Sequence, residues 1–379
     1  MTAISSALVV GAGIGGLTAA VALMQQGISV EVIEIEPEIT VYGVGIIQPN
    51  NTLRALDRLG LAQACVEQGA PFPGWRIYDA AGKVLMDAPA TSDAAPDFPP
   101  NNGITRPKLH RILTGAAAEL GVPIRFGTSI VTFADTPEGV DVAFSDGTTG
   151  RYDLVVGSDG LYSNLRRKLF GDGLKPEFTG QGVWRYNLPR PASVEWGELY
   201  VGPSSKVGLV PLSPTLMYML IVTPERKEAR WEGAQLAVEM RQRLDEYSGL
   251  ISELKPLITD PAQVVYRPME SMLLPAPWMK GRIVLIGDAA HSTTPHLAQG
   301  AAMAIEDAVL LAELMARDAP VPALLEEFMS RRFARAKFVV ESSRQIGDWE
   351  LEEWAGALTP GADPGALLHN ATQALMEAY

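Results

Sequence analysis

Two histidines stand close together in the segment GDAAHSTTPHLAQGAAMAIEDA, residues 287–308, although the whole chain has only four. The segment begins as the end of a buried strand and finishes, after Gly300, with the apolar spacing of a helix. A zinc site needs three or four converging ligands, and neither a cysteine nor a further histidine stands near His291 and His296. We therefore predict no metal site here, and instead a loop whose imidazoles either handle a proton or hold a turn.

A glycine-rich turn lies near the start of the chain. Gly11, Gly13 and Gly16 form G-x-G-x-x-G between the apolar run ALVV and the helical stretch LTAAVALMQQG. The first glycine permits a tight turn, the second lets a pyrophosphate approach the backbone, and the third lets helix and strand pack closely. Glu34 ends the next expected strand, ISVEVIE, where a carboxylate can accept hydrogen bonds from ribose hydroxyls. Together these features predict a dinucleotide-binding βαβ unit.

Composition and charge narrow the class of protein. The 379 residues are too many for one simple core, which predicts two closely packed domains. A net charge of −13 disfavours nucleic acid as a partner, although amides at a helix N-terminus can still bind an anionic cofactor. The single cysteine, Cys65, excludes an intramolecular disulfide. With no leader pattern and no apolar run of roughly 20 residues, we expect a cytoplasmic protein without a membrane partner.

The elements that must position these residues fall into two kinds. Helix and strand signals alternate up to about residue 176 and resume at GRIVLIGDAA, whereas the stretch between is rich in Tyr, Trp, Val and Pro and predicts an antiparallel sheet. We expect a discontinuous dinucleotide-binding domain of residues 1–70, 104–176 and 267–345, an inserted substrate domain of residues 71–103 and 177–266, and a C-terminal helical segment of residues 346–379.

Three segments in this order carry a family resemblance: GAGIGG, DLVVGSDGLYSNLR and GRIVLIGDAAHSTTPHLAQGAAMAIEDA. They resemble the single-component FAD-dependent aromatic hydroxylases, the group A flavoprotein monooxygenases, most of all the salicylate, 3-hydroxybenzoate and 6-hydroxynicotinate hydroxylase type. The likeness runs from residue 7 to about 345. It implies a p-hydroxybenzoate hydroxylase-like α/β fold, in which a Rossmann-like FAD-binding domain carries an inserted antiparallel β-sheet. It also implies an enzyme that uses FAD, NADH or NADPH, and O₂ to hydroxylate an aromatic or heteroaromatic ring through a flavin C4a-hydroperoxide.

The resemblance assigns FAD contacts to matching positions. Asp159 is the acid of the family's Asp-Gly motif, which touches FAD and influences NAD(P)H binding, and Asp288 would bind the ribityl chain. The amides of Ala301 and Ala302 would face the pyrimidine edge of the ring from a helix N-terminus, which suits the negative charge of a reduced flavin. The full set of expected FAD contacts is Gly11, Gly13, Gly15, Gly16, Glu34, Gly45, Ile46, Arg106, Asp159, Gly287, Asp288, Gly300, Ala301 and Ala302.

The same resemblance implies different roles for His291 and His296. His291 stands where the family very often has histidine, which implies that it fixes the turn. Pro295 matches a residue at the junction of flavin and substrate, so Pro295 and His296 are the catalytic candidates. His296 either deprotonates or orients a phenolic substrate, or it only lines the pocket, and the sequence leaves both roles open.

Candidate substrate contacts lie on the inserted sheet, namely Tyr186, Tyr200 and Tyr218, with Arg185 as a carboxylate partner. Side chains alternate along a strand, so only one of Arg185 and Tyr186 can face the pocket. Ile47, a further candidate substrate contact, stands where some family members with pyridine substrates have histidine. Because it is apolar, the resemblance does not carry that particular specificity over to this chain.

Other interpretations of the same motifs remain. The enzyme could act on a larger polycyclic natural product or a purine-like ring, or the chain could be a flavin-binding regulatory protein without turnover. Halogenation is disfavoured because the sequence lacks a Trp-x-Trp-x-x-Pro segment. We expect a small aromatic substrate and a monomer or homodimer, and no residue distinguishes NADH from NADPH.

Overall fold

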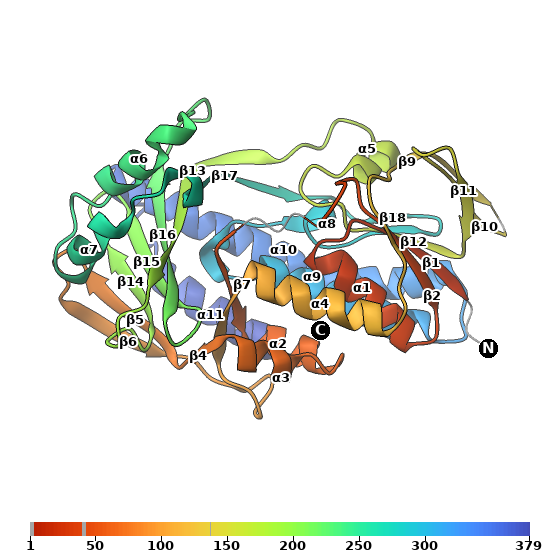
Figure 1. The fold of residues 1–379 in the computed structure, drawn as a ribbon, viewed down its shortest axis with the longest axis horizontal. Helices are drawn as coiled ribbons and strands as arrows, with labels where there is room; N and C mark the ends of the chain where they lie inside the picture. Colours follow the sequence, from red (N-terminus) through yellow and green to blue (C-terminus); the bar gives the residue numbers. More distant parts are fainter. Residues whose placement is uncertain (1–3, 40–42, 137) are drawn as a thin grey trace.

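The computed structural model describes residues 4–39, 43–136 and 138–379. It confirms the expected fold class, an α/β domain built on a parallel sheet with an antiparallel sheet inserted into it (Figure 1). The two sheets lie at opposite ends of the molecule, and the long helix α10 (Val321–Trp354) runs between them.

The glycine turn opens a six-stranded sheet whose strands are parallel except for its first edge pair. Because the strands are parallel, the residues that follow three neighbouring strands meet at one edge: Gly11, Ser158 and Ile286. In spatial order the strands are β18 (Met279–Lys280), β19 (Ile283–Leu285), β12 (Leu154–Gly157), β1 (Ser6–Val10), β2 (Ser29–Ile33) and β8 (Ile124–Arg125).

Helices cover this sheet and bury its apolar strands. The helix after the glycine turn, α1 (Ile14–Gln25), is buried from Gly15 to Leu23 because it packs against two further helices as well as the sheet. These are α4 (Arg106–Glu119) and α9 (Gly300–Met315). Two shorter helices, α5 (Asn164–Phe170) and α8 (Asp288–His291), begin soon after β12 and β19. The glycine turn, the Asp-Gly motif and the GDAA motif thus lie close together, each near the start of a helix.

The inserted sheet has seven strands, antiparallel except where β14 pairs with β5. Its outer face is covered by α6 (Leu236–Gln242) and α7 (Gly249–Leu254), and its inner face is turned toward the parallel-sheet domain. In spatial order the strands are β17 (Val265–Leu273), β13 (Glu177–Pro189), β16 (Leu216–Pro224), β15 (Lys206–Pro211), β14 (Gly197–Val201), β5 (Gly74–Asp79) and β6 (Val84–Pro89).

Smaller elements join the two domains. One antiparallel sheet packs against the inserted sheet and consists of β3 (Gly45–Pro49), β7 (Asn101–Thr105) and β4 (Ala70–Phe72). Another consists of β9 (Ile130–Thr136), β10 (Gly139–Phe144) and β11 (Thr149–Tyr152). The remaining helices are α2 (Asn50–Asp57), α3 (Ala62–Gln68) and α11 (Pro364–Met376), and the 3₁₀ turns are Gly233–Gln235, Lys255–Leu257, Pro261–Gln263 and η4 (Pro295–Leu297).

Two elements cross the domain boundaries expected from composition. β17 continues the inserted sheet to Leu273, past the expected boundary at residue 266, because its partner β13 is long enough to pair with it. α10 runs through residue 345 without a break, so the C-terminal segment is continuous with the helix before it. In the part of the chain that the structure describes, no helix has the length and apolar character needed to cross a membrane.

Candidate functional site

The glycine turn leaves room for an anionic group at the start of α1. Gly11 has φ +104°, and a Cβ there would lie 2.5 Å from the backbone oxygen of Ser158. A Cβ on Gly16 would lie 1.9 Å from the oxygen of Gly11, so both positions require glycine. Beside Gly13 the space is open to at least 4 Å, and α1 has neither a side-chain cap nor an acid in its first turn. Its first amides are therefore free to bind a phosphate.

Glu34 lies beside this turn. The amide of Ala12 donates to its Oε2 at 2.8 Å, and the amide of Glu36 donates to its Oε1 at 3.0 Å. Each carboxylate oxygen has a further lone pair, so the half-buried Glu34 can still accept a hydrogen bond from a hydroxyl group. The turn and the acid thus fit the phosphates and ribose of a dinucleotide.

The Asp-Gly motif lies next to Gly11 because β12 is the parallel neighbour of β1. The Asp159 carboxylate accepts hydrogen bonds from the Ser163 hydroxyl and from the Leu165 amide, the latter at 3.0 Å, so it caps α5. Arg166 is buried and donates to the carbonyl oxygens of Leu161 and Ala289, at 2.8 and 3.0 Å. This guanidinium ties the Asp-Gly loop to the loop that carries Asp288.

Asp288 is exposed to solvent, although surrounding protein atoms partly desolvate its carboxyl group. This is expected for a group that faces an open binding site. Burial raises its pKa, and His291 and Arg106 oppose that rise. The preceding residue, Gly287, has φ +57° and donates its amide to Asp307 Oδ2 at 2.9 Å. The conformation of this turn therefore depends on an acid in α9.

His291 belongs to the support of that turn. Its Nε2 lies 2.6 Å from Asp307 Oδ2, and its ring packs on Trp278 with the centroids 4.8 Å apart. The side chain is 1% exposed, so it has no contact with an external ligand. Among the residues that the structure describes, no group of three His, Cys, Asp or Glu side chains could hold a metal ion.

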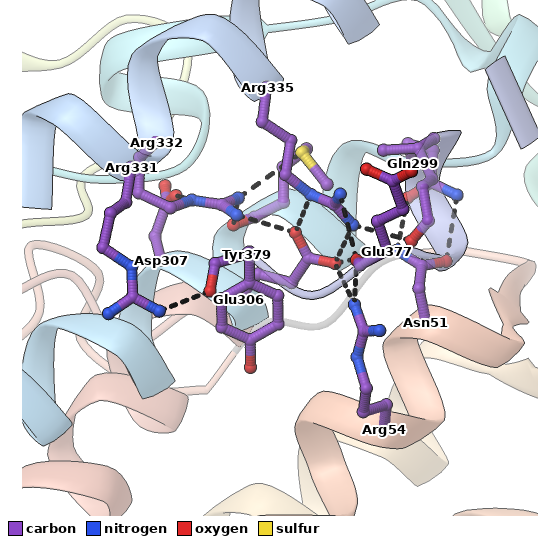
Figure 2. A network of polar contacts seen from close by, with 12 residues as sticks. Asn51, Arg54, Gln299, Glu306, Asp307, Arg331, Arg332, Arg335, Glu377 and Tyr379 are labelled. Atoms are coloured by element: carbon purple, nitrogen blue, oxygen red, sulfur yellow. Dashed lines mark hydrogen bonds and ion pairs between the residues drawn. The ribbon is translucent and has the colours of Figure 1, made fainter. Parts of the chain in front are cut away.

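A buried network of charged side chains on α9 and α10 supports the turn that carries Asp288 (Figure 2). Arg332 on α10 donates from Nη1 to Glu306 at 2.8 Å and from Nε to Asp307 at 2.7 Å, and all three side chains are fully buried. Arg335 donates to the same Glu306 carboxylate, also at 2.8 Å. No motif had pointed to this network. The one signal in the sequence is that Glu306 and Asp307 are the first charged residues after Asp288.

The start of α9 resembles the start of α1. Gln299 precedes the helix without capping it, and no acid lies in its first turn, so the amides from Gly300 to Ala302 are available to an anion. Ala298 has φ +55°, which makes it the one non-glycine residue in the left-handed region among those described. Gln299 is buried and bonded in both directions to Asn51, with donor–acceptor distances of 3.0 and 3.2 Å.

The inner face of the inserted sheet carries a cation without a partner. Among the described residues, none bonds to or forms an ion pair with the Arg185 guanidinium. Burial, and secondly repulsion from Arg106, lowers its pKa to about 10, so it stays charged at neutral pH. Burial raises the pKa of Tyr218 to about 12, against the attraction of the two arginines. A Cβ on Gly45 would lie 2.2 Å from the Tyr218 ring, and Ile47 packs in the same apolar cluster.

Asn187 adds an acceptor to this face. It stands two residues after Arg185 on β13 and pairs with Tyr218 on β16, so the three side chains share one face of the sheet. Its Oδ1 is buried without a hydrogen-bond partner among the described groups. The sequence analysis missed Asn187, although its spacing from Arg185 was a signal.

Tyr186 and Tyr200 lie on the opposite face and are not brought together with Arg185. Both belong to the apolar cluster under α6 and α7. The Tyr186 hydroxyl accepts from the Asp260 amide at 3.3 Å, and the Tyr200 hydroxyl donates to Glu198 at 2.8 Å. For Tyr186 the reason is alternation along β13, which directs Arg185 inward and Tyr186 outward.

His296 is almost completely enclosed, with 1% of its side chain exposed. Its Nδ1 lies 2.8 Å from the Thr294 hydroxyl, and its Nε2 lies 3.2 Å from Glu350 Oε2. Burial, and secondly Lys206, lowers the pKa of His296, although Glu350 opposes this. Lys206 and His296 in turn hold the pKa of Glu350 at about 2 against its burial. Both imidazole nitrogens thus already have protein partners, whereas Pro295 beside it is exposed.

Comparison with known proteins agrees with this geometry. A family model described as FAD binding domain matches residues 5–343. The 2-heptyl-3-hydroxy-4(1H)-quinolone synthase of Pseudomonas aeruginosa (strain UCBPP-PA14) is 33% identical over 349 residues, which cover 90% of each chain. The 3-hydroxybenzoate 6-hydroxylase 1 of Aquipseudomonas alcaligenes is 30% identical over 365 residues, or 92% of this chain and 90% of that one. A variant of Klebsiella pneumoniae HpxO in complex with FAD superimposes with a TM-score of 0.84 at 25% identity, covering 99% and 95% of the two chains.

Proposed function

This chain belongs to the FAD-binding family of flavoprotein monooxygenases that includes the group A aromatic hydroxylases, and we propose that it hydroxylates an anionic aromatic or heteroaromatic ring at the expense of NADH or NADPH and O₂. The observation that carries the substrate class is the unpartnered Arg185 on the inner face of the inserted sheet. The nicotinamide and the C4a route described above rest on the family, and a monomeric or homodimeric state is part of the proposal.

Most of the residues that would hold FAD lie near one edge of the parallel sheet, whereas Gly45 and Ile46 lie on β3 and Arg106 begins α4. The open α1 start would bind the pyrophosphate and Glu34 the ribose, while Asp288 and the amides that begin α9 would bind the ribityl chain and ring. When bound, FAD supplies hydride acceptance and oxygen activation, so that one oxygen atom enters the ring and the other leaves as water. We propose as FAD contacts the residues expected from the sequence: Gly11, Gly13, Gly15, Gly16, Glu34, Gly45, Ile46, Arg106, Asp159, Gly287, Asp288, Gly300, Ala301 and Ala302. Asp159 also holds the start of α5 through its bonds to Ser163 and Leu165.

Three side chains on the inner face of the inserted sheet could bond to a substrate: Arg185 and Tyr218 as donors and Asn187 as an acceptor. A half-buried guanidinium without a counter-ion loses part of its hydration, and a carboxylate or phenolate would offset that cost through charge-assisted hydrogen bonds. Tyr218 stays protonated at neutral pH because its pKa is about 12, so it can donate to an oxyanion. The free Oδ1 of Asn187 can accept a ring hydroxyl. Together with the apolar Ile47, this set fits a hydroxylated aromatic acid.

We propose that His296 positions the Pro295 turn. Glu350 is ionised, so it draws the proton of the neutral ring to Nε2, and Nδ1 then accepts from the Thr294 hydroxyl. The other role left open by the sequence, proton transfer from the substrate, would have to run through that hydroxyl. The bonds from His296 to Thr294 and Glu350 connect η4 to α10, which favours the positioning role.

The proposed substrate class can be tested by measuring the oxidation of NADH and NADPH. The assay compares how strongly benzoates and matched neutral phenols stimulate this oxidation. We expect the anionic compounds to be preferred and Arg185→Gln to remove that preference. Losing one charge-assisted hydrogen bond of about 1.5–3 kcal/mol should raise KM for the acid by roughly 10- to 150-fold. Tyr186→Phe is the matched control, since it changes the neighbouring side chain on the other face. An unsubstituted enzyme that did not prefer the anionic compounds would exclude an anionic substrate. A preference that survived in Arg185→Gln would show that Arg185 is not the partner of the acid.

A further inference from the structure

The chain beyond the matched family region returns to the back of the proposed flavin site. The family match ends at residue 343, and α11 lies beyond it. We call residues 364–379, which comprise α11 and the three residues after it, the C-terminal strap. Ala371 and Leu375 of the strap pack in one apolar cluster with Leu297 of η4 and with Ala302 and Met303 of α9. The strap thus touches the loop and the helix start that would face the ring of FAD.

The strap adds little to the apolar core, because only two of its side chains are fully buried. Polar bonds to its backbone hold its end in place instead. Arg335 donates to the carbonyl oxygen of Leu375 at 2.8 Å, and Arg54 donates to those of Met376 and Glu377 at 2.7 and 2.8 Å. These carbonyls end a helix, where cationic side chains are favourable.

The same arginine connects the strap to the start of α9 (Figure 2). Arg335 holds Glu306 with two bonds of 2.8 Å, and Glu306 Oε1 accepts from Asn51 at 2.9 Å. Asn51 is in turn bonded to Gln299, the residue before α9. An unbroken series of bonds therefore runs from the strap to the loop that would contact the flavin.

That loop needs such support. Ala298, next to Gln299, has φ +55°, a left-handed conformation that is unfavourable for alanine and persists only where the surroundings enforce it. α2 contacts this stretch through Asn51, and the strap contacts it through Leu297. The long helix α10 also supports it, through the bond from His296 to Glu350 and through apolar side chains in the same cluster as Leu297.

We propose that the C-terminal strap is a positioning element for residues 297–303, and that Arg335 is the residue through which it acts on them. It keeps the amides at the start of α9 aligned for the flavin ring without itself touching ligand. The inference rests on the proposed FAD site for its consequence, whereas the alignment of the loop is a property of the protein alone.

The test is hydrogen–deuterium exchange on the purified protein, with and without FAD, comparing Arg335→Gln with Arg335→Lys and Arg344→Gln. Arg344 is the control, since it lies on α10 and pairs with Glu177 at 2.9 Å without contacting the strap. In Arg335→Gln we expect exchange of the hydrogen-bonded backbone amides in residues 297–303, those of Ala298 and Met303, to rise by about tenfold or more, the effect of losing a charge-assisted hydrogen bond. Exchange in β1 and α1 should not change, and Arg335→Lys should restore part of the protection.

Flavin binding provides the second measurement. Fluorescence titration of the apoprotein with FAD should show about tenfold weaker binding for Arg335→Gln, and the visible absorption band of the bound flavin should shift. Truncation after residue 363 should reproduce both effects. Exchange that rises equally in all regions would make the strap a general stabiliser and overturn the proposal, as would unchanged exchange in residues 297–303. A protein that shows the local exchange effect but hydroxylates no aromatic acid would refute only the proposed function.

Discussion

Replacing Asp307 with asparagine should weaken the turn that carries Asp288, although Asp307 does not face a ligand. The Asp307 carboxylate accepts from the Gly287 amide at 2.9 Å, from His291 Nε2 at 2.6 Å and from Arg332 Nε at 2.7 Å. Asparagine keeps the shape of the side chain but removes its charge. It also places an NH₂ group against a donor, so at least one of the three bonds must be lost.

The magnitude follows from the pKa of Asp307. Burial alone would raise this pKa, but His291, Arg332 and the Gly287 amide lower it from 3.8 to about 2. That difference corresponds to roughly 2–3 kcal/mol of stability at neutral pH. Breaking a buried ion pair costs about 3–5 kcal/mol, and Arg332 keeps its bond to Glu306. We therefore expect Asp307→Asn to lower the free energy of unfolding by about 2–4 kcal/mol at pH 7.

The effect should depend on pH in a defined direction. A carboxyl with a depressed pKa contributes its stabilisation fully above its unfolded pKa, near 4, and loses it as pH falls through its folded pKa, near 2. The gap between Asp307→Asn and the unsubstituted protein should therefore narrow between about pH 4 and pH 2. The variant lacks the titrating group and so shows no such loss of its own.

Urea unfolding, followed by circular dichroism on the apoprotein and on the FAD complex, measures this gap. Glu313→Gln is the matched control on the same helix, because Glu313 pairs at 2.7 Å with an arginine that is 62% exposed, and such surface pairs contribute about 0–1 kcal/mol. FAD affinity should fall in Asp307→Asn and not in the control. A loss below 1 kcal/mol at pH 7, or one equal to that of the control, would refute the argument that the network supports the turn.

Further predictions concern single side chains. Gly16→Ala should abolish flavin retention, read from the absorbance of the purified protein, because its Cβ would lie 1.9 Å from a backbone oxygen, whereas Gly13→Ala should fold with an unchanged Tm. His296→Gln and Thr294→Val should each keep hydroxylation within about tenfold, while a fall of about 10²–10⁴-fold with rising hydrogen peroxide would reveal proton transfer through this pair. Burial raises the pKa of Cys65 to about 11, so mass spectrometry should find it unmodified by iodoacetamide at pH 8 until urea unfolds the protein.

The sequence by itself determined the family, the fold class and the enzyme class, and all three are confirmed by the comparisons. The reason is that their signals are local. A glycine that must adopt positive φ, an acid at the end of a strand and a helix start without a cap are each encoded within a few residues. The turn at Gly11 and Gly16 can be recognised from the sequence alone, because no other residue fits at these two positions. The assignments of individual contacts to FAD and substrate stay predictions.

Only the tertiary structure decided which side chains meet. Alternation predicted that Arg185 and Tyr186 point to opposite faces, but which face lies toward the parallel-sheet domain depends on how the two domains pack. The buried network of Asp307 and Arg332, and its extension to the strap through Arg335, joins residues 20 to 40 positions apart on different elements. Such contacts leave no periodic pattern in the chain, because a charge is buried only where the partner that compensates it arrives from another element.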